Sequence, residues 1–424
     1  MDDKILPMSK SILVNLGIVF LVVLLLGVLL YQVPAVKSQL NWRIDIAETY
    51  LRNLINPVGQ IPTPLPQPVA AVTLSATDLP TAQPTAELIT PTPGRTPTQT
   101  PRPTQIPPSI NLGSPAWEKQ TPNNCGPATL SLYLNTHNWE GEQGDISALL
   151  KPQTADRNVN VEELVYYVRT QAGWLNTEYR VGGDIELLKS FLAAGLPVMI
   201  EEGFHFEESY WPNDDRWAGH YLLLTGYDDT TQSFIAQDTF IGPDQIVPYQ
   251  SVEENWQTFN YVYILVYRPD QTDLVKSLLG EAWDPDVNRQ QALELAQSQT
   301  TDDPNNAYAW FNLGSNLVYF ERYNEAAQAY DKARQAGLPQ RMLRYQFGPF
   351  FAYFFSGRND DLLTISEYAL QRTPNSEEAL LWRGWGRYRA GDYFQAIEDF
   401  QAALEENPFY QDARYALDYV AENP

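Results

Sequence analysis

Residues 124–134 read NCGPATLSLYL, a turn followed by an apolar stretch, and they include Cys125, the single cysteine of the 424-residue chain. Pro127 suits the first turn of a helix, where its missing N–H costs no hydrogen bond. The pattern therefore predicts a helix that begins near Cys125. A thiol at that position lies at the positive end of the helix dipole, which favours its ionised form. One cysteine excludes an intrachain disulfide framework and a Cys-x-x-Cys redox pair, so Cys125 is either an inert core thiol or a nucleophile.

The chain after this helix changes from helical to strand-like periodicity. Val161–Thr170 and Asp184–Ala194 show helical patterns, and Gly195 suits the end of the second. The strand-like stretches that follow are 197–200, 219–229, 233–238 and 261–267. Residues 228–232, DDTTQ, are expected to form the hairpin turn between the second and third of these strands. We therefore expect one α+β domain over residues 112–268, with the helices first and the sheet second.

Two further residues suit a thiol-based active site with Cys125. The stretch GHYLLLTGYDD, residues 219–229, places His220 on a strand, and Asp238 ends the strand after the hairpin. A cysteine needs an imidazole to act as a nucleophile, and a carboxylate fixes the tautomer of that imidazole. The backbone N–H of the cysteine supplies one donor to an oxyanion. The order of thiol, imidazole and carboxylate predicts that Cys125, His220 and Asp238 are catalytic.

The motifs CGPATLSLYL, GHYLLLTGYDD and IAQD together resemble those of papain-like bacterial cysteine peptidases related to the bacteriocin-leader-processing family, in the branch of stand-alone domains. The three motifs occur in the family's order. The resemblance implies an α+β papain-like cysteine peptidase domain in which Cys125 is the nucleophile, His220 the general base and Asp238 the orienting carboxylate. It also implies an upstream glutamine that stabilises the oxyanion. Gln120 is the candidate, although it lies five residues before Cys125 where the pattern usually has six.

The other two histidines are expected outside the catalytic set. His137 suits a helix end, and His205 suits a surface ion pair, with a place along the cleft as the alternative. Residues 204–218, FHFEESYWPNDDRWA, combine polar and aromatic side chains just before His220. We expect them to form a lid or a substrate-reading loop, the alternative being an insertion without function. No motif such as HExxH occurs, and the sequence predicts neither a metal nor a cofactor.

The N-terminal region has the composition of a membrane segment. Residues 12–33, ILVNLGIVFLVVLLLGVLLYQV, carry no charged side chain, and about 20 apolar residues suffice to cross the ~30 Å core of a bilayer. The sequence predicts a transmembrane helix there, with residues 1–11 as a short cytoplasmic tail. A cleaved signal peptide is the alternative, although its apolar run is usually only ~7–15 residues long. Residues 34–56 are expected to form an amphipathic helix on the membrane surface.

A segment rich in proline and threonine follows at residues 57–111. Residues 57–115 contain fifteen Pro and eleven Thr, a composition that excludes helix and sheet and predicts an extended, disordered stalk. Such stalks are typical of external surfaces. We therefore expect a single-pass protein of the cell membrane whose C-terminal domains lie outside the cytoplasm. A ligand for an SH3-type domain is the alternative reading of the prolines.

The C-terminal third repeats with a period of 34 residues. Units that start at Ala307 and Glu377 share Gly at position 8, Tyr at 17, Ala at 20 and 27, and an aromatic residue at 24. Small residues at these positions let paired helices approach, and the aromatic side chains fill the gaps. The pattern resembles tetratricopeptide repeats. It predicts an all-α tetratricopeptide-repeat solenoid over residues 282–424.

The ends and the middle of this array depart from the repeat. The middle unit, from Leu343, keeps fewer of the shared positions, and Pro349 is expected to kink its first helix. Residues 286–299 suit a preceding half-unit, and residues 410–420 suit a capping helix. The resemblance implies a groove for a peptide or protein partner; the alternative is a rigid support packed on the peptidase domain.

The charge distribution limits the partners. The chain carries a net charge of −24, of which residues 112–268 contribute −14 and residues 269–424 contribute −11. An acidic folded part excludes nucleic acid as a partner, since phosphate binding requires a basic face.

Together these patterns predict a membrane-anchored extracytoplasmic cysteine peptidase that hydrolyses peptide bonds through a Cys-His-Asp triad. Its repeats would present a peptide or protein substrate or a partner. Two alternatives remain open at this point. One is an inactive peptidase-like scaffold whose repeats do the binding, and the other is a thiol amidase or acyltransferase.

Overall fold

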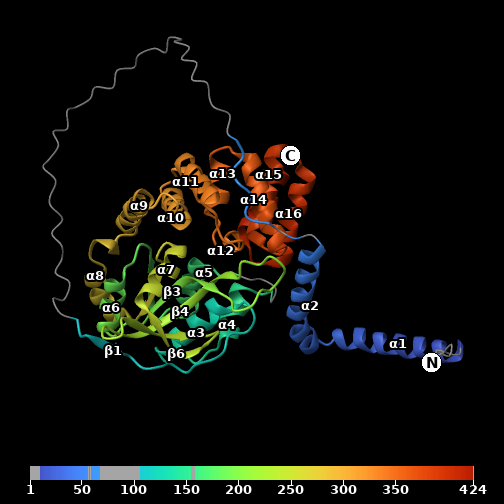
Figure 1. Ribbon diagram of the computed structural model, residues 1–424, viewed down its shortest axis with the longest axis horizontal. Helices are drawn as coiled ribbons and strands as arrows, with labels where there is room; N and C mark the ends of the chain where they lie inside the picture. Colours follow the sequence, from blue (N-terminus) through green and yellow to red (C-terminus); the bar gives the residue numbers. More distant parts are fainter. Residues whose placement is uncertain (1–9, 56, 58, 67–105, 154–157, 424) are drawn as a thin grey trace, which may run out of the picture.

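The computed structural model describes residues 10–55, 57, 59–66, 106–153 and 158–423 of the chain. It consists of an α+β unit, a helical unit packed on it, and two N-terminal helices (Figure 1). Nearly all of the predicted cytoplasmic tail, residues 1–9, lies outside the described residues. So does most of the predicted stalk, residues 67–105.

The α+β unit is built on a seven-stranded sheet in which every neighbouring pair of strands is antiparallel. The strands are β1 (Ser109–Asn111), β2 (Asn176–Arg180), β3 (Val198–His205), β4 (Trp217–Asp228), β5 (Ser233–Asp238), β6 (Gly242–Pro248) and β7 (Tyr263–Tyr267). They follow the order β2-β7-β3-β4-β5-β6, and β1 pairs with the end of β4. The long strands β3 and β4 therefore lie at the centre of the sheet.

Alternate side chains of the central strands pack into two apolar clusters. Met199, Leu223 and Val266 share one cluster with helices on one face, and Ile200 and Leu222 share the other with helices on the opposite face. The helices on the face of Met199 are α3 (Cys125–Asn135), α4 (Gln143–Leu150) and α5 (Val161–Gln171). The helices on the face of Ile200 are α6 (Ile185–Ala193), α7 (Tyr249–Trp256) and α8 (Thr272–Leu279). Burial on both faces fixes the register, because a slip by one residue would exchange the faces.

The helices expected in this unit form where the sequence predicts them, whereas one strand is longer than expected. Asp184 caps α6 by accepting a hydrogen bond from Leu187 N at 2.6 Å. The strand expected at 197–200 extends to His205 as β3, so Glu201 and Glu202 lie within the sheet. All of β3 pairs with residues 217–224 of β4, and these cross-strand hydrogen bonds outweigh the low strand propensity of glutamate.

The helical unit begins after three short 3₁₀ helices and runs to the C-terminus. The 3₁₀ helices are η1 (Gln257–Phe259), η2 (Pro269–Gln271) and η3 (Gly280–Trp283). The α-helices are α9 (Pro285–Asp302), α10 (Ala307–Tyr319), α11 (Tyr323–Ala336), α12 (Met342–Tyr345), α13 (Gly348–Phe355), α14 (Asn359–Arg372), α15 (Glu377–Ala390), α16 (Tyr393–Glu406) and α17 (Gln411–Glu422). These helices include the expected half-unit, three helix pairs and a final helix.

The middle repeat differs from the expectation of a kinked helix. Its first helix is divided into α12 and α13, and Pro349 lies in the first turn of α13. Proline is favoured at that position because its fixed φ suits a helix start and its missing N–H has no partner to lose. Pro349 therefore begins a separate helix. The short α12 before it contacts β4 of the α+β unit.

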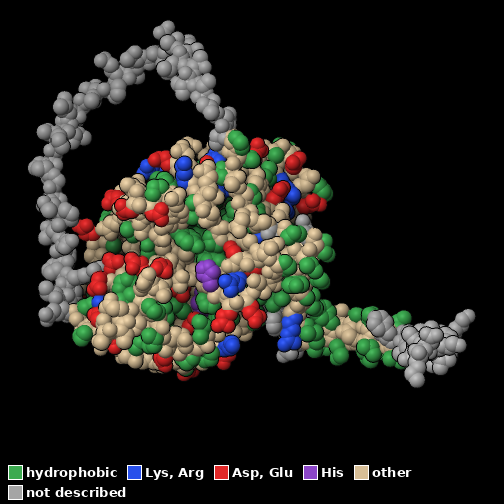
Figure 2. Space-filling view, viewed as in Figure 1, with side chains coloured by type: hydrophobic (Ala, Val, Ile, Leu, Met, Phe, Trp, Pro, Cys, Tyr) green, Lys and Arg blue, Asp and Glu red, His purple; other side chains and the backbone are tan. Residues whose placement is uncertain are grey.

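Two N-terminal helices precede these units: α1 (Lys10–Tyr31) and α2 (Pro34–Ile55). Exposed apolar side chains line α1 from Ile18 to Leu30 (Figure 2). Within the described residues, no helix meets the combined requirements of length and hydropathy for a membrane span. The transmembrane helix predicted at 12–33 is thus unsupported.

The structure corrects one expectation about the segments that follow. Residues 34–55 form the predicted helix, and Thr49 and Asn53 of α2 are buried, while its placement on a membrane surface stays a prediction. The stalk was expected to form no regular structure, but Ser109–Asn111 pairs with β4 as β1. At the other end of the stalk, Ile61 is only 5% exposed and belongs to the main apolar core. Both ends of the predicted stalk are therefore held on the folded units.

The spacing of glycine and aromatic residues that two repeats of this chain share gives a testable prediction about packing. A Cβ atom on Gly384 would lie 2.4 Å from the ring of Phe400, whereas a Cβ on Gly144 in α4 would meet nothing within 4 Å. We expect Gly384→Ala to lower the free energy of unfolding by about 1–3 kcal/mol through overpacking. Gly144→Ala is the control, and its helix propensity should stabilise slightly. Equal urea unfolding midpoints for the two variants would contradict this assignment of the helix pair.

Candidate active site

Cys125 lies at the start of α3, in the position that the sequence predicted. It is partly exposed, whereas the nine residues that follow it are buried. The first N–H groups of an α-helix have no partner within the helix, so they can donate to a group bound at its start. Gly126 allows this start to approach the sheet, because a Cβ there would lie 3.3 Å from the ring of Tyr221. The fold thus presents the thiol at an open end of an otherwise buried helix.

His220 and Asp238 form a buried pair beside it. His220 is on β4 and Asp238 ends β5, and each is about 4% exposed. His220 Nε2 lies 3.0 Å from Asp238 Oδ1. The same oxygen accepts hydrogen bonds from Phe240 N at 2.7 Å and from Ile241 N at 3.0 Å. Since Nε2 is engaged by the carboxylate, Nδ1 is the ring nitrogen that remains for the thiol.

The pair is polarised toward an imidazolium and a carboxylate. Burial acts to lower the pKa of His220, but the hydrogen bonds and negative charges of Asp238 and Cys125 raise this pKa to about 10. Burial acts to raise the pKa of Asp238, but its hydrogen bonds with His220 and with two backbone amides hold this pKa below the usual value. At neutral pH the ring of His220 is therefore an imidazolium, protonated on both nitrogens.

Gln120 lines the same cleft as Cys125 and His220. Its Oε1 accepts a hydrogen bond from the Thr239 hydroxyl at 2.9 Å, and its backbone N donates to Thr239 O at 2.9 Å. Because Oε1 is held in this way, the amide NH₂ is the end of the side chain left for a ligand. The structure therefore brings together all four residues that the sequence predicted for the site.

Aromatic side chains form the wall of the cleft around His220. The ring of Phe204 lies 5.3 Å from that of His220 between centroids, and Phe240 lies 6.4 Å from it. Phe206 and Tyr210 extend this wall. The cleft has a volume of about 240 Å³. Its apolar wall excludes water from one side of the imidazole, which strengthens the electrostatic interactions there.

The helical unit supplies the opposite rim of this cleft. Arg341, Arg344 and Tyr345, at and within α12, line it together with residues of the α+β unit. Tyr345 packs edge-on against Trp217 and Phe259 at 5.8 and 6.1 Å. Sequence reasoning did not place these residues in the site, because the break that creates α12 is hidden within a degenerate repeat.

The expected lid is fixed to the repeats. Only residues 206–216 form a loop, since Phe204 and His205 belong to β3, and Trp217 begins β4. Arg341 donates to Asp214 Oδ2 at 2.7 Å and to Trp217 O at 2.6 Å. Gln340 N donates to Asp215 Oδ2 at 2.6 Å. These bonds make the loop a docked wall of the cleft.

Two buried glutamates next to the site were missed by the sequence prediction. Glu202 pairs with His220 across the strands, and burial raises its pKa to about 8. Its Oε2 has no hydrogen-bond partner among the described residues. Glu201 points to the other face, where burial raises its pKa well above the usual value. The signal was two carboxylates in the apolar stretch VMIEEGF.

A second hollow lies on the other side of Tyr345, between the two units. It has a volume of about 560 Å³, and its lining includes six carboxylates. These are Glu162, Glu163, Glu201, Glu377, Glu378 and Asp412. A small pocket lined by Cys125, Glu201 and Tyr345 lies between the cleft and this hollow. The nucleophile candidate is thus flanked by an aromatic cleft and an acidic hollow.

The two other histidines lie apart from the pair. His137 Nε2 lies 3.1 Å from Val266 O, and its ring stacks on Tyr133 after the end of α3. Burial lowers the pKa of His137. His205 is exposed at the end of β3. In the described part of the chain, no three His, Cys, Asp or Glu side chains are grouped as metal ligands.

Comparison with known proteins supports the identity of both units. The model of the Peptidase_C39-like family matches residues 113–264, and that of the tetratricopeptide repeat matches residues 377–410. No curated protein matches the chain significantly.

Three solved structures that are similar to parts of the chain are each 20% identical to it or less. Xylellain, a cysteine protease from Xylella fastidiosa, is 15% identical with a TM-score of 0.28 over 39% of this chain and 87% of its own. A double glycine motif protease from an AMS/PCAT transporter is 13% identical with a TM-score of 0.28, over 38% and 94%. YrrB, a TPR protein, is 20% identical with a TM-score of 0.29, over 41% and 81%. On the family matches, residues 113–264 form a Peptidase_C39-like domain, and the helical unit contains a tetratricopeptide repeat at 377–410.

Proposed function

We propose that this protein is a cysteine peptidase that hydrolyses peptide bonds, with Cys125 as the nucleophile, His220 as the proton carrier and Asp238 as the orienting carboxylate. The observation that carries this proposal is the buried His220–Asp238 pair, 3.0 Å apart, in the cleft that Cys125 also lines. A thiol and an imidazolium at the open start of a helix can exist as an ion pair, which makes the sulfur nucleophilic at neutral pH.

The chemistry follows from the positions of the protons. The Cys125 thiolate attacks the carbonyl carbon of the scissile bond, and His220 gives its proton to the leaving amine as the C–N bond breaks. The neutral ring then takes a proton from water, which attacks the thioester and releases the acid. The C–S bond breaks as the thiolate of Cys125 leaves, and the proton from water stays on His220, which restores the ion pair. Asp238 keeps the ring in position throughout, because Nε2 remains bound to it.

Two donors are proposed for the oxyanion formed in each attack. One is the backbone N–H of Cys125 in the first turn of α3, and the other is the NH₂ group of Gln120. Removing one donor of this kind typically costs 10²–10³-fold in rate. Thr239 positions Gln120, so a substitution of Thr239 affects the reaction only through the side-chain amide of Gln120.

The surroundings of the nucleophile limit the substrate. The acidic hollow beyond Tyr345 disfavours a polyanionic peptide, and the aromatic cleft favours apolar side chains on the other side of the scissile bond. We propose a peptide or protein substrate that is neutral or basic on one side of the bond and apolar on the other. The repeats contribute to this path directly, since Tyr345 and Glu377 line the hollow.

Placement outside the cytoplasm, through an N-terminal membrane anchor, is a proposal that rests on the sequence of residues 12–33 and 57–111. If it holds, protease added to intact cells should cut within the Pro/Thr-rich residues 67–105 and shorten the protein. The measurement is a denaturing immunoblot that detects the C-terminal part. A full-length band that persists until the membrane is broken would contradict this placement.

The proposed ion pair predicts how Cys125 reacts. At pH about 6.5, iodoacetamide should alkylate it much faster than an ordinary cysteine, and His220→Ala should slow the reaction because the cationic partner is lost. His205→Ala is the matched control, since that ring is exposed and lies at the end of β3. Cys125→Ala should abolish hydrolysis of labelled casein, and Asp238→Asn should lower it by roughly 10²–10⁴-fold. Equal alkylation rates in both histidine variants would refute the proposal.

The buried Glu202 predicts how stability depends on pH. In the folded protein Glu202 stays protonated up to about pH 8, because its pKa is raised to about 8 from the ordinary value of 4.5. The folded state therefore binds more protons between these values, and the free energy of unfolding falls as the pH rises from about 4.5 to about 8. Glu202→Gln should flatten this decline in urea unfolding, and the exposed Glu208→Gln should not. Identical pH dependence in all three proteins would show that Glu202 is not the source.

A further inference from the structure

A short extended segment lies on the repeats like a bound peptide. Residues 59–66 contact Arg334 of α11 and Asp361 of α14, and Ile61 is 5% exposed within the main apolar core. Thr63, Leu65 and Pro66 are exposed. Pro62 and Pro64 are half-buried. One buried apolar anchor, with half-buried and exposed residues alternating after it, is what an anchored extended ligand shows.

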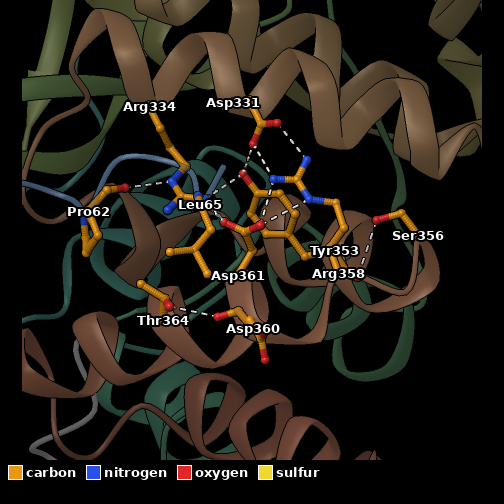
Figure 3. Close-up of polar contacts among 10 residues, drawn as sticks. All are labelled: Pro62, Leu65, Asp331, Arg334, Tyr353, Ser356, Arg358, Asp360, Asp361 and Thr364. Atoms are coloured by element: carbon orange, nitrogen blue, oxygen red, sulfur yellow. Dashed lines mark hydrogen bonds and ion pairs between the residues drawn. The ribbon is translucent and has the colours of Figure 1, made fainter. Parts of the chain in front are cut away.

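The remaining recognition is through the backbone of this segment. Arg334 Nε donates to Pro62 O at 2.8 Å, and Leu65 N donates to Asp361 Oδ1 at 3.1 Å (Figure 3). Tyr368 and Arg372 donate to Gly59 O at 3.1 and 2.8 Å. Main-chain bonds supply affinity and the side-chain pocket supplies specificity, as in other sites for extended peptides. The surface formed by Arg334, Asp361, Tyr368 and Arg372 is hereafter the segment site.

Buried charges hold the segment site in shape. Arg334 and Asp361 are each 2% exposed at the side chain and lie 3.1 Å apart. Arg358 bridges Asp331 at 2.6 Å and Asp361 at 2.7 Å. Burial acts to raise the pKa of Asp361, but the bonds from Arg358 and from Leu65 N hold it below the usual value. Such a network is costly to bury unless its groups are bonded, and the segment's backbone supplies partners to Arg334 Nε and to Asp361 Oδ1.

The same site connects the segment to the catalytic cleft. Arg372 Nη1 donates to Asn53 Oδ1 on α2 at 3.4 Å, while its Nη2 donates to Gly59 O. About two turns earlier on α2, Ile46 lines the cleft that contains Cys125 and His220. Thr49, between these two residues, is buried. The position of α2 at the cleft is therefore coupled to the seating of residues 59–65.

We propose that the segment site is an extended-peptide site that the chain's own residues 59–65 occupy, and that this occupancy holds α2 across the mouth of the catalytic cleft as a releasable restraint. Displacement of the segment frees α2 and withdraws Ile46 from the cleft. Access of a large substrate to Cys125 then increases. The part of this inference that concerns activity rests on the proposed peptidase function.

Ile61→Asp tests the restraint in the full-length protein, because a carboxylate cannot remain in the apolar core. Thr63→Asp is the matched control, since it adds the same charge two residues away at an exposed position. Hydrogen exchange of the α2 amides should increase at least tenfold in the first variant and stay unchanged in the second. Leu65→Pro, which removes the N–H donor to Asp361 without adding charge, should act in the same direction as Ile61→Asp.

Access to the cleft is measured at Cys125, which is the only cysteine. The ratio of its labelling rates with a bulky polyethylene glycol maleimide and with N-ethylmaleimide should rise severalfold in Ile61→Asp and Leu65→Pro, and remain at the wild-type value in Thr63→Asp. Both reagents attack the same thiolate, so the ratio reports access even if Cys125 is not activated by His220. Failure here is thus distinct from failure of the peptidase proposal.

A synthetic peptide of residues 57–67, PVGQIPTPLPQ, tests whether the site binds in trans. It should bind the full-length Ile61→Asp protein, restore the wild-type labelling ratio, and bind the wild-type protein at least tenfold more weakly, because that site is occupied. The same peptide with Asp in place of Ile61 should not bind. Unchanged α2 exchange in both segment variants, or equal peptide binding to wild type and Ile61→Asp, would overturn the proposal.

Discussion

The buried guanidinium of Arg341 is a central contact between the two folded units, and it lines the cleft. Arg341 lies in the connector between repeats, is 2% exposed, and donates to Asp214 at 2.7 Å and to Trp217 O at 2.6 Å. It also stacks on the Trp211 ring at 4.1 Å. A buried cation is stable only when fully partnered, so the loop 206–216 and the repeats constrain each other. Phe206 and Tyr210 of this loop belong to the aromatic wall of the cleft, so residues of both units line the candidate active site.

The catalytic candidates could be predicted because local chemistry determines them. A cysteine before a proline-initiated helix, a histidine in an apolar strand and an aspartate after a hairpin each fit one position, and the fold brings them together as expected. Glu201 and Glu202 were missed because the apolar pattern ended the predicted strand at Ile200, directly before these two charged residues. The cross-strand pairing of Glu202 with His220 is a long-range contact that composition does not encode. Periodicity alone thus shortened β3 by five residues.

The contacts between units were beyond prediction for a similar reason. The repeat spacing identified helix pairs such as α10–α11 and α15–α16, whose glycines face aromatic rings. The repeat spacing did not predict α12. Pro349 lies in the first turn of a new helix, α13, and the separate turn before it, α12, contacts β4. Low-complexity composition likewise argued for a free stalk, whereas Ile61 is buried and Ser109–Asn111 joins the sheet. A few specific contacts at its ends override the average character of the segment.

The geometry of α14 explains how such distant parts can act together. Arg372, near its C-terminal end, donates to Gly59 O and Asn53 Oδ1 and lies 5.4 Å from the ring centroid of Trp211, so one side chain contacts the segment, α2 and the cleft wall. Rigid packing transmits a change at one of these contacts, because a close-packed interior has discrete arrangements rather than a continuous range. The two carboxylate–guanidinium networks, around Arg341 and around Arg334, lie on successive elements of the same repeat region. The repeats therefore line the cleft through Arg341, Arg344 and Tyr345 and, at α11 and α14, contact the N-terminal segment.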